Sequence, residues 1–177
     1  MSYENAKANL KEFALELKLE LSFDENHTCI LGIDNTFSLH ITYEPNSDKL
    51  YLYAPILDGL PQDPKIRLKL YENFLEGSLL GGKMAGGGVG VAVKEELILM
   101  HCVLDMGLGA DVKALSRFSA LFVEVVEQWR AIATKICAGQ EPPPFTIPGM
   151  PGQPQIGGPS ATGPGILSKP PEGFIKI

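Results

Sequence analysis

The chain has 177 residues, and its 21 acidic residues outnumber its 15 basic ones, which gives a net charge of -6. Binding to nucleic acid or to an anionic membrane surface depends on Lys and Arg that neutralise phosphates, so this charge argues against both partners. No apolar run approaches the roughly 20 residues that cross a bilayer, and the N-terminal residues lack the apolar stretch of a signal peptide, so we expect a cytoplasmic protein without membrane insertion.

The first 60 residues predict one helix followed by three strands. In residues 3–18, Leu10, Phe13 and Leu17 recur at helical spacing opposite a charged face, which predicts an amphipathic helix. The predicted strands occupy residues 27–33, 36–43 and 49–57. The connections between them are too short for parallel crossovers, so the three strands form an antiparallel meander.

The next predicted helix has the clearest start signal in the chain. Asp63 stands at the capping position and Pro64 at the first helical position, where its missing N–H is harmless. The helix runs to about residue 78 and is apolar on two faces, so it needs two packing partners. The chain's own sheet supplies one partner, and a second subunit is a candidate for the other.

The rest of the body predicts a glycine-rich connector, a hairpin and a long helix. Residues 81–90 indicate a flexible connector. Residues 89–93 and 96–104 predict two strands, of which the second is apolar on both faces and therefore central or at an interface. Residues 111–138 repeat apolar side chains every three or four positions, which predicts a long helix against the sheet.

The last 39 residues differ from this body. Residues 139–177 hold ten of the 14 prolines and eight of the 19 glycines of the chain. Such a composition does not form a packed core, so we expect a disordered tail. The sequence therefore predicts one α+β domain at 1–138, in the order αβββαββα with helices packed on a twisted antiparallel sheet, and a tail at 139–177.

The sequence contains no complete motif of catalysis or cofactor binding. Residues 77–84, GSLLGGKM, approach a phosphate-binding loop, but Met84 stands where that loop needs Ser or Thr. His101 and Cys102 are neighbours on a strand and point to opposite faces, so they do not ligate one metal together. We expect no cofactor, no metal and no catalytic residue. A small α+β enzyme or a small-molecule-binding domain remains the alternative.

Several strings resemble one known family. They are LYLYAP at 50–55, LDGLP at 57–61, YENFLEG at 71–77, MAGGGVGVA at 84–92 and LILMHCVLDM at 97–106. Together with the element order and Trp129-Arg130 in the long helix, they resemble the class I type III secretion chaperones, the Tir chaperone family. The last two strings are most similar to the chlamydial SycE-like branch, which serves early effectors.

The resemblance implies a bacterial, virulence-related homodimer that binds the extended N-terminal segment of secreted effectors, keeps it competent for secretion and delivers it to the secretion apparatus. The secretion-apparatus ATPase is a further expected partner. The family carries no cofactor and no catalytic activity. Carried over onto this chain, the effector-binding groove falls on Leu10, Phe13, Leu17, Ile33, Phe37 and Leu52. The dimer interface falls on Leu68, Tyr71, Leu75, Val91 and Val93.

Overall fold

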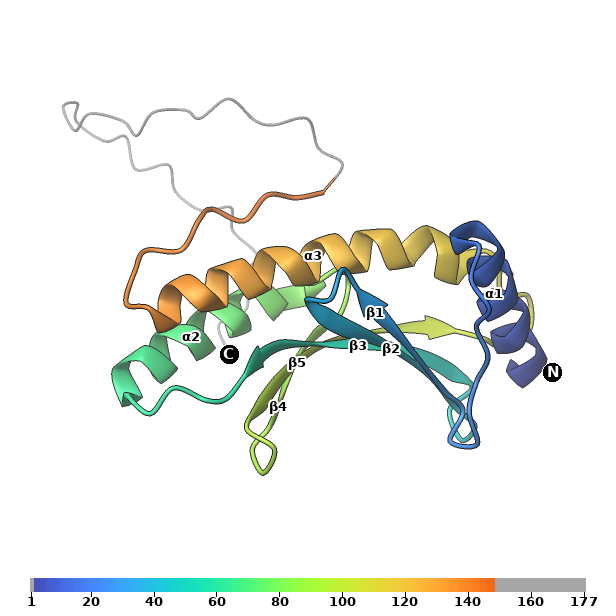
Figure 1. The fold of residues 1–177 in the computed structure, drawn as a ribbon, viewed down its shortest axis with the longest axis horizontal. Helices are drawn as coiled ribbons and strands as arrows, with labels where there is room; N and C mark the ends of the chain where they lie inside the picture. Colours follow the sequence, from blue (N-terminus) through green and yellow to red (C-terminus); the bar gives the residue numbers. More distant parts are fainter. Residues whose placement is uncertain (1, 149–177) are drawn as a thin grey trace, which may run out of the picture.

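The computed structural model describes residues 2–148, in which three α-helices cover one face of a five-stranded antiparallel sheet (Figure 1). The elements are α1 (Ser2–Leu17), β1 (Thr28–Ile33), β2 (Phe37–Glu44), β3 (Lys49–Asp58), α2 (Pro64–Ser78), the 3₁₀ turn η1 (Leu79–Gly81), β4 (Gly88–Ala92), β5 (Leu97–Asp105) and α3 (Ala114–Cys137). The predicted α+β class and the order αβββαββα are confirmed.

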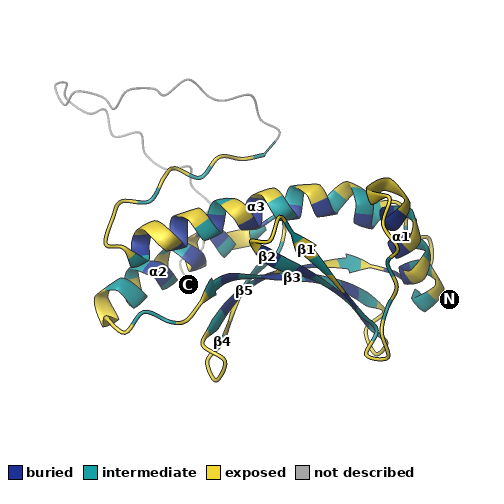
Figure 2. Cartoon of the chain, viewed as in Figure 1, coloured by how far each residue is buried: buried dark blue, intermediate teal, exposed yellow. Residues whose placement is uncertain are grey.

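The strand order in the sheet is β1-β2-β3-β5-β4, with every pair antiparallel. β5 lies between β3 and β4, as expected for a central strand, but only one of its faces is buried: Ile98 and Met100 are in the core, whereas Val103 on the other face is 44% exposed. β1 and β4 are the two edge strands. Residues of β2 and β3 alternate between buried and half-buried, so one sheet face meets the helices and the other stays partly open (Figure 2).

α3 runs along the sheet and packs against both other helices (Figure 1). α1 contacts α3 near its N-terminal end, and α2 lies beside its C-terminal half. Phe122, Val126 and Trp129 of α3 are buried between the helices and the sheet. Burying a large apolar side chain contributes on the order of 1.5–3 kcal/mol, so this stripe is a major part of the core.

One buried polar side chain fixes α1 to the start of α3. Asn9 is fully buried, and its Nδ2 donates to the carbonyl oxygens of Asn5 and Asp111 at 3.1 and 3.0 Å. Its Oδ1 accepts from the N–H of Leu115 at 3.0 Å. The N–H groups of the first helical turn have no partner inside the helix, so Asn9 satisfies one of them from a different helix.

The glycine-rich segment 81–90 folds into a hydrogen-bonded turn that leads into β4, and its flexibility stays a prediction. After α2 the chain makes a compact turn, in which the N–H groups of Met84 and Gly86 both donate to the carbonyl of Gly81, at 3.1 and 3.0 Å. Met84 is fully buried, and the carbonyl of Lys83 accepts a hydrogen bond from the Trp129 indole at 2.7 Å. Gly81 has a φ of +68°, which favours glycine.

We predict that Gly87→Ala lowers the free energy of unfolding by about 2–3 kcal/mol, because a Cβ atom at this position overpacks against rigid backbone. That Cβ would lie 1.8 Å from the carbonyl oxygen of His101 on β5. Gly90→Ala is the matched control in the same segment, since a Cβ there meets nothing within 4 Å. Urea unfolding of both variants tests the prediction, and equal stabilities would contradict it.

The chain after α3 does not leave the body at once. Residues 141–148 run back along α3, and Phe145 packs against the core. Most of this segment is exposed, and Phe145 packs on the body because its aromatic side chain finds an apolar partner there; the domain boundary at residue 138 stays a prediction. Residues 149–177, the remainder of the expected disordered tail, lie outside the described residues. Within residues 2–148, no helix is long and apolar enough to cross a membrane.

Candidate functional site

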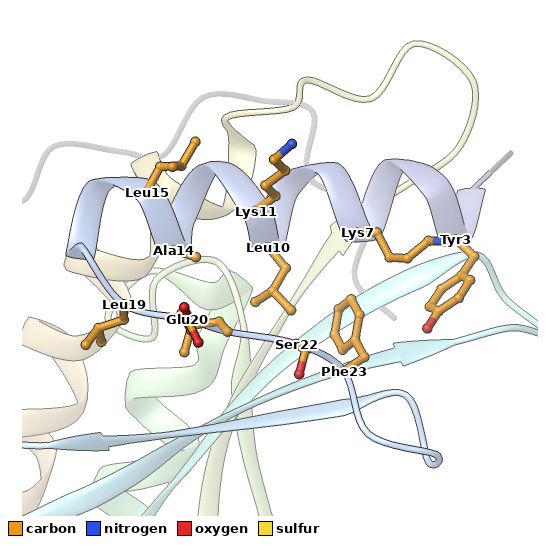
Figure 3. Close-up of a pocket in the computed structure, with 11 residues that line it drawn as sticks. Tyr3, Lys7, Leu10, Lys11, Ala14, Leu15, Leu19, Glu20, Ser22 and Phe23 are labelled. Carbon is orange, nitrogen blue, oxygen red and sulfur yellow. The ribbon is translucent and has the colours of Figure 1, made fainter.

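A cavity of about 720 Å³ opens between α1 and the segment 19–23 that follows it (Figure 3). We call it the α1 groove. Its apolar lining comes from Leu10, Ala14, Leu15, Leu19, Leu21 and Phe23. Its polar lining comes from Tyr3, Lys7, Lys11, Glu20 and Ser22. An open, mainly apolar groove with a few charges at its rim suits a ligand that brings apolar side chains.

A tight turn at the end of α1 creates the groove. Lys18 has a φ of +55°, and the N–H of Leu19 bonds back to the carbonyl of Ala14 at 3.0 Å. At the other end of the segment, the N–H of Asp24 donates to the carbonyl of Thr28 at 2.9 Å, and the Asp24 carboxylate accepts from the Thr28 N–H at 2.8 Å. The segment between these anchors forms the second wall.

An aromatic cluster closes one end of the groove. The Tyr3 ring lies 6.0 Å from Phe23, 4.8 Å from His27 and 5.1 Å from Tyr43, measured between ring centroids. Lys7 Nζ stands 4.9 Å from the centre of the Tyr3 ring. Such contacts fix the position of Tyr3, so the end of the groove is a defined surface.

The three cysteines of the chain are not activated as nucleophiles. Burial raises the pKa of the Cys102 thiol to about 12 and also raises the pKa of Cys29 and of Cys137. All three cysteines are free thiols. A raised pKa keeps them protonated at neutral pH, and the protonated thiol is a poor nucleophile. None of the three cysteines lines the α1 groove.

The predicted effector-binding residues lie in three different environments. Leu10, Phe13, Phe37 and Leu52 are buried, with 2%, 6%, 8% and 0% exposure. Leu10 also lines the α1 groove. Leu17 is exposed and Ile33 is half-buried, and neither lines the groove. Four of the six side chains thus pack inside the single chain, and their role toward an effector stays a prediction.

The sequence reasoning missed most of the groove. Leu15 and Leu19 are 63% and 49% exposed, and Leu21 and Phe23 form the second wall. A signal was present, because Leu19, Leu21 and Phe23 alternate with polar residues. That alternation is typical of an extended segment with one apolar side, even though this one joins no sheet.

A second apolar surface lies on α2, η1 and β4, and we call it the α2–β4 surface. The predicted interface residues are exposed or half-buried there: Leu68 (59%), Leu75 (68%), Val91 (40%), Val93 (71%) and the half-buried Tyr71. Leu79 and Leu80, at 70% and 98% exposure, were not predicted. Leu70 and Phe74 fill the opposite side of α2 against the core, which confirms that α2 is apolar on two faces. So many exposed leucines on adjoining elements are unusual for a monomer.

The fold and the α1 groove are those of a protein that binds an extended partner. The profile of the Tir chaperone protein (CesT) family matches residues 8–130. The match covers more than half of the chain, so the chain belongs to the Tir chaperone family. No curated protein shows a significant match.

Solved structures agree with the family. A chain of the HopA1–SchA chaperone–effector complex has 27% identity and a TM-score of 0.56, covering 71% of this chain and 93% of that chain. A chain of the ExsC–ExsE complex has 16% identity and a TM-score of 0.56, and the match covers 73% of this chain and 93% of that chain. A chain of the ExoT–SpcS complex of Pseudomonas aeruginosa has 18% identity and a TM-score of 0.52, covering 70% and 96%. The last two show the fold alone.

The family assignment confirms the predicted resemblance and the predicted class of function. The chain is a type III secretion chaperone and not an enzyme, because the family consists of binding proteins. The alternative of a small α+β enzyme is therefore set aside. The narrower similarity to the SycE-like branch stays a prediction.

Proposed function

We propose that the α1 groove holds the extended N-terminal segment of a secreted effector in the bacterial cytoplasm and keeps that segment competent for secretion. One observation carries the assignment, namely an open groove whose two walls present leucines to solvent, Leu15 from α1 and Leu19 from the following segment. An unfolded guest must offset the entropy of its ordering, and burial of its apolar side chains in such a groove provides that free energy.

The neighbouring sheet edge offers the guest a second kind of contact. β1 pairs only with β2, so one side of its backbone has no strand partner among the described elements. Ile30, at its centre, is 59% exposed. An extended peptide gains main-chain hydrogen bonds when it adds to an edge strand, and alternate side chains then supply specificity. Segment 19–23 reaches β1 through the turn at residues 24–27, and one guest is proposed to use both the groove and this edge.

The working unit that we propose is a homodimer joined through the α2–β4 surface. Support comes from Leu68, Leu75 and Leu80, which are at least 59% exposed on adjoining elements. Burying them against a second copy removes apolar area from water, and a self-complementary patch closes a two-fold dimer. One effector segment per two subunits is the expected stoichiometry.

The double substitution Leu15→Asp and Leu19→Asp tests the groove. We expect the affinity for the effector segment to fall at least about 100-fold, since each leucine contributes on the order of 1.5–3 kcal/mol when it is buried by the guest. The measurement starts with co-purification of the bound segment from the native cell. Titration of that segment by calorimetry then compares the variant with the unchanged chain.

Leu108→Asp is the matched control, because Leu108 is 97% exposed and does not line the groove. Charged residues at Leu10 or Phe13 make a poorer test, since both side chains are buried and the charge would unfold α1 from the core. Unchanged affinity of the Leu15/Leu19 variant would show that the guest binds elsewhere.

A further inference from the structure

Residues 141–148 form a strap that lies on the C-terminal half of α3 (Figure 1). The Phe145 ring packs on Trp129, with ring centroids 5.6 Å apart. The N–H of Thr146 donates to Oε1 of Gln128 at 2.9 Å, and Glu141 pairs with Lys69 of α2 at 3.0 Å. The strap thus contacts both helices, at the end of α3 away from the α1 groove.

The strap lies in a groove between α2 and α3. Asn73 and Glu76 of α2, Lys83 of the ordered turn, and Trp129 and Ile132 of α3 line it together with the strap. Two contacts hold the Trp129 indole in place. Its Nε1–H donates to the Lys83 carbonyl at 2.7 Å, and its ring packs on Phe74 with the ring centroids 5.4 Å apart. A cleft of about 240 Å³ remains beside the strap, so the segment does not fill the groove.

The chemistry of the strap is that of a peptide ligand. Pro142, Pro143 and Pro144 carry no backbone N–H and have a restricted φ, so they lose little conformational entropy when they dock. Phe145 follows them and supplies the aromatic anchor on Trp129. Grooves lined with aromatic side chains recognise proline-rich segments, and here Phe145 makes the aromatic contact while Pro143 and Pro144 stay exposed.

The strap is held weakly enough for another peptide to replace it. Its ion pair is solvent-exposed, with Glu141 at 90% side-chain exposure, and such pairs contribute about 0–1 kcal/mol. Ile147 is 49% exposed and adds little burial. The aromatic contact and the single Thr146 hydrogen bond are therefore the main attachments among the described residues.

We propose that the groove between α2 and α3 is a binding site for extended proline-rich peptides with an aromatic residue after the prolines, and that the strap is its occupant within the same chain. A partner carrying such a segment displaces the strap and docks beside α2. This site is separate from the α1 groove, so its test does not depend on effector binding.

Fluorescence of Trp129, the one tryptophan of the sequence, reports on the site in the full chain. Phe145→Ala is expected to shift its emission to longer wavelength, because the indole loses its aromatic cover. Thr146→Pro, which removes the N–H donor to Gln128, is expected to shift it in the same direction by less. Ile147→Ala is the matched control and leaves the emission unchanged, since Ile147 is half exposed.

The second step adds a capped peptide with the sequence of residues 141–148, EPPPFTIP, to the full-length Phe145→Ala chain. We expect the peptide to reverse the shift, and the same peptide with alanine in place of phenylalanine to bind at least tenfold more weakly. The unchanged chain should bind the peptide at least tenfold more weakly than the variant, because its tethered strap competes at an effective concentration on the order of millimolar.

Three results would overturn the proposal. They are an unchanged emission in both Phe145→Ala and Thr146→Pro, equal binding of the two peptides, and equal affinity of the peptide for the variant and for the unchanged chain. The last would place the peptide at a different surface. Each readout is independent of whether an effector binds the α1 groove.

Discussion

Asn9→Leu is expected to lower the free energy of unfolding by about 3 kcal/mol. Leucine has the same number of side-chain heavy atoms as asparagine and the same branching at Cγ, so the change removes the polarity, and its bulkier methyl groups add some overpacking. The N–H of Leu115 and the carbonyl of Asp111 then lose their partner in a site that is closed to water. A buried donor or acceptor without a partner costs about 1–3 kcal/mol, and this substitution leaves one of each.

The effect is large because Asn9 joins segments that are 106 positions apart in the chain. Without its hydrogen bonds, the start of α3 depends on Asp111, whose carboxylate accepts from the Lys113 N–H at 2.9 Å. Urea unfolding followed by circular dichroism measures the loss. Asn46→Leu serves as the control, since Asn46 is exposed and bonds only to nearby Glu44. Equal stability of Asn9→Leu and the unchanged chain would mean that water or a shifted side chain satisfies both groups.

Leu75→Asp is expected to convert the proposed dimer into monomers, with at least about a 100-fold rise in the dimer dissociation constant. In a two-fold interface every substitution occurs twice, so the loss of apolar burial and the cost of a buried carboxylate are both doubled. Leu75 is 68% exposed in the single chain, and its replacement removes no core contact. The variant should therefore stay folded.

Sedimentation equilibrium across a range of concentrations measures this change. Leu108→Asp provides the control, because Leu108 is still more exposed and lies outside the α2–β4 surface. An unchanged chain that sediments as a monomer at all concentrations would contradict the dimer itself. A Leu75→Asp variant that remains dimeric would leave the dimer in place and move the interface to another surface.

Local signals in the sequence specify the elements of this fold almost completely. Asp63 caps α2 as predicted, accepting from the N–H of Lys65 at 2.8 Å, and Pro64 is the first helical residue. β2 alternates between buried and half-buried side chains along its whole length. These signals succeed because capping and alternation depend on neighbours within a few residues of the chain.

The site is harder to predict, because exposure depends on what the rest of the chain covers. Leu10 and Leu15 are both leucines of α1, yet one is 2% and the other 63% exposed. Nothing in the helix itself separates a leucine of the core from a leucine of the groove. The role of the glycines at 81–90 was hard to predict for a related reason. Gly87 is required by the close approach of β5 and not by freedom of the backbone.

The strand order β1-β2-β3-β5-β4 has a consequence for the length of the guest. The α1 groove adjoins the β1 edge of the sheet, whereas the α2–β4 surface adjoins the β4 edge. In a dimer joined through the α2–β4 surface, the two α1 grooves therefore lie at opposite ends. In a dimer whose two five-stranded sheets meet edge to edge there, strands about 4.8 Å apart separate the grooves by on the order of 40 Å. A single polypeptide that reaches both needs a spacer of at least about 12 extended residues, so shorter guests engage one end alone.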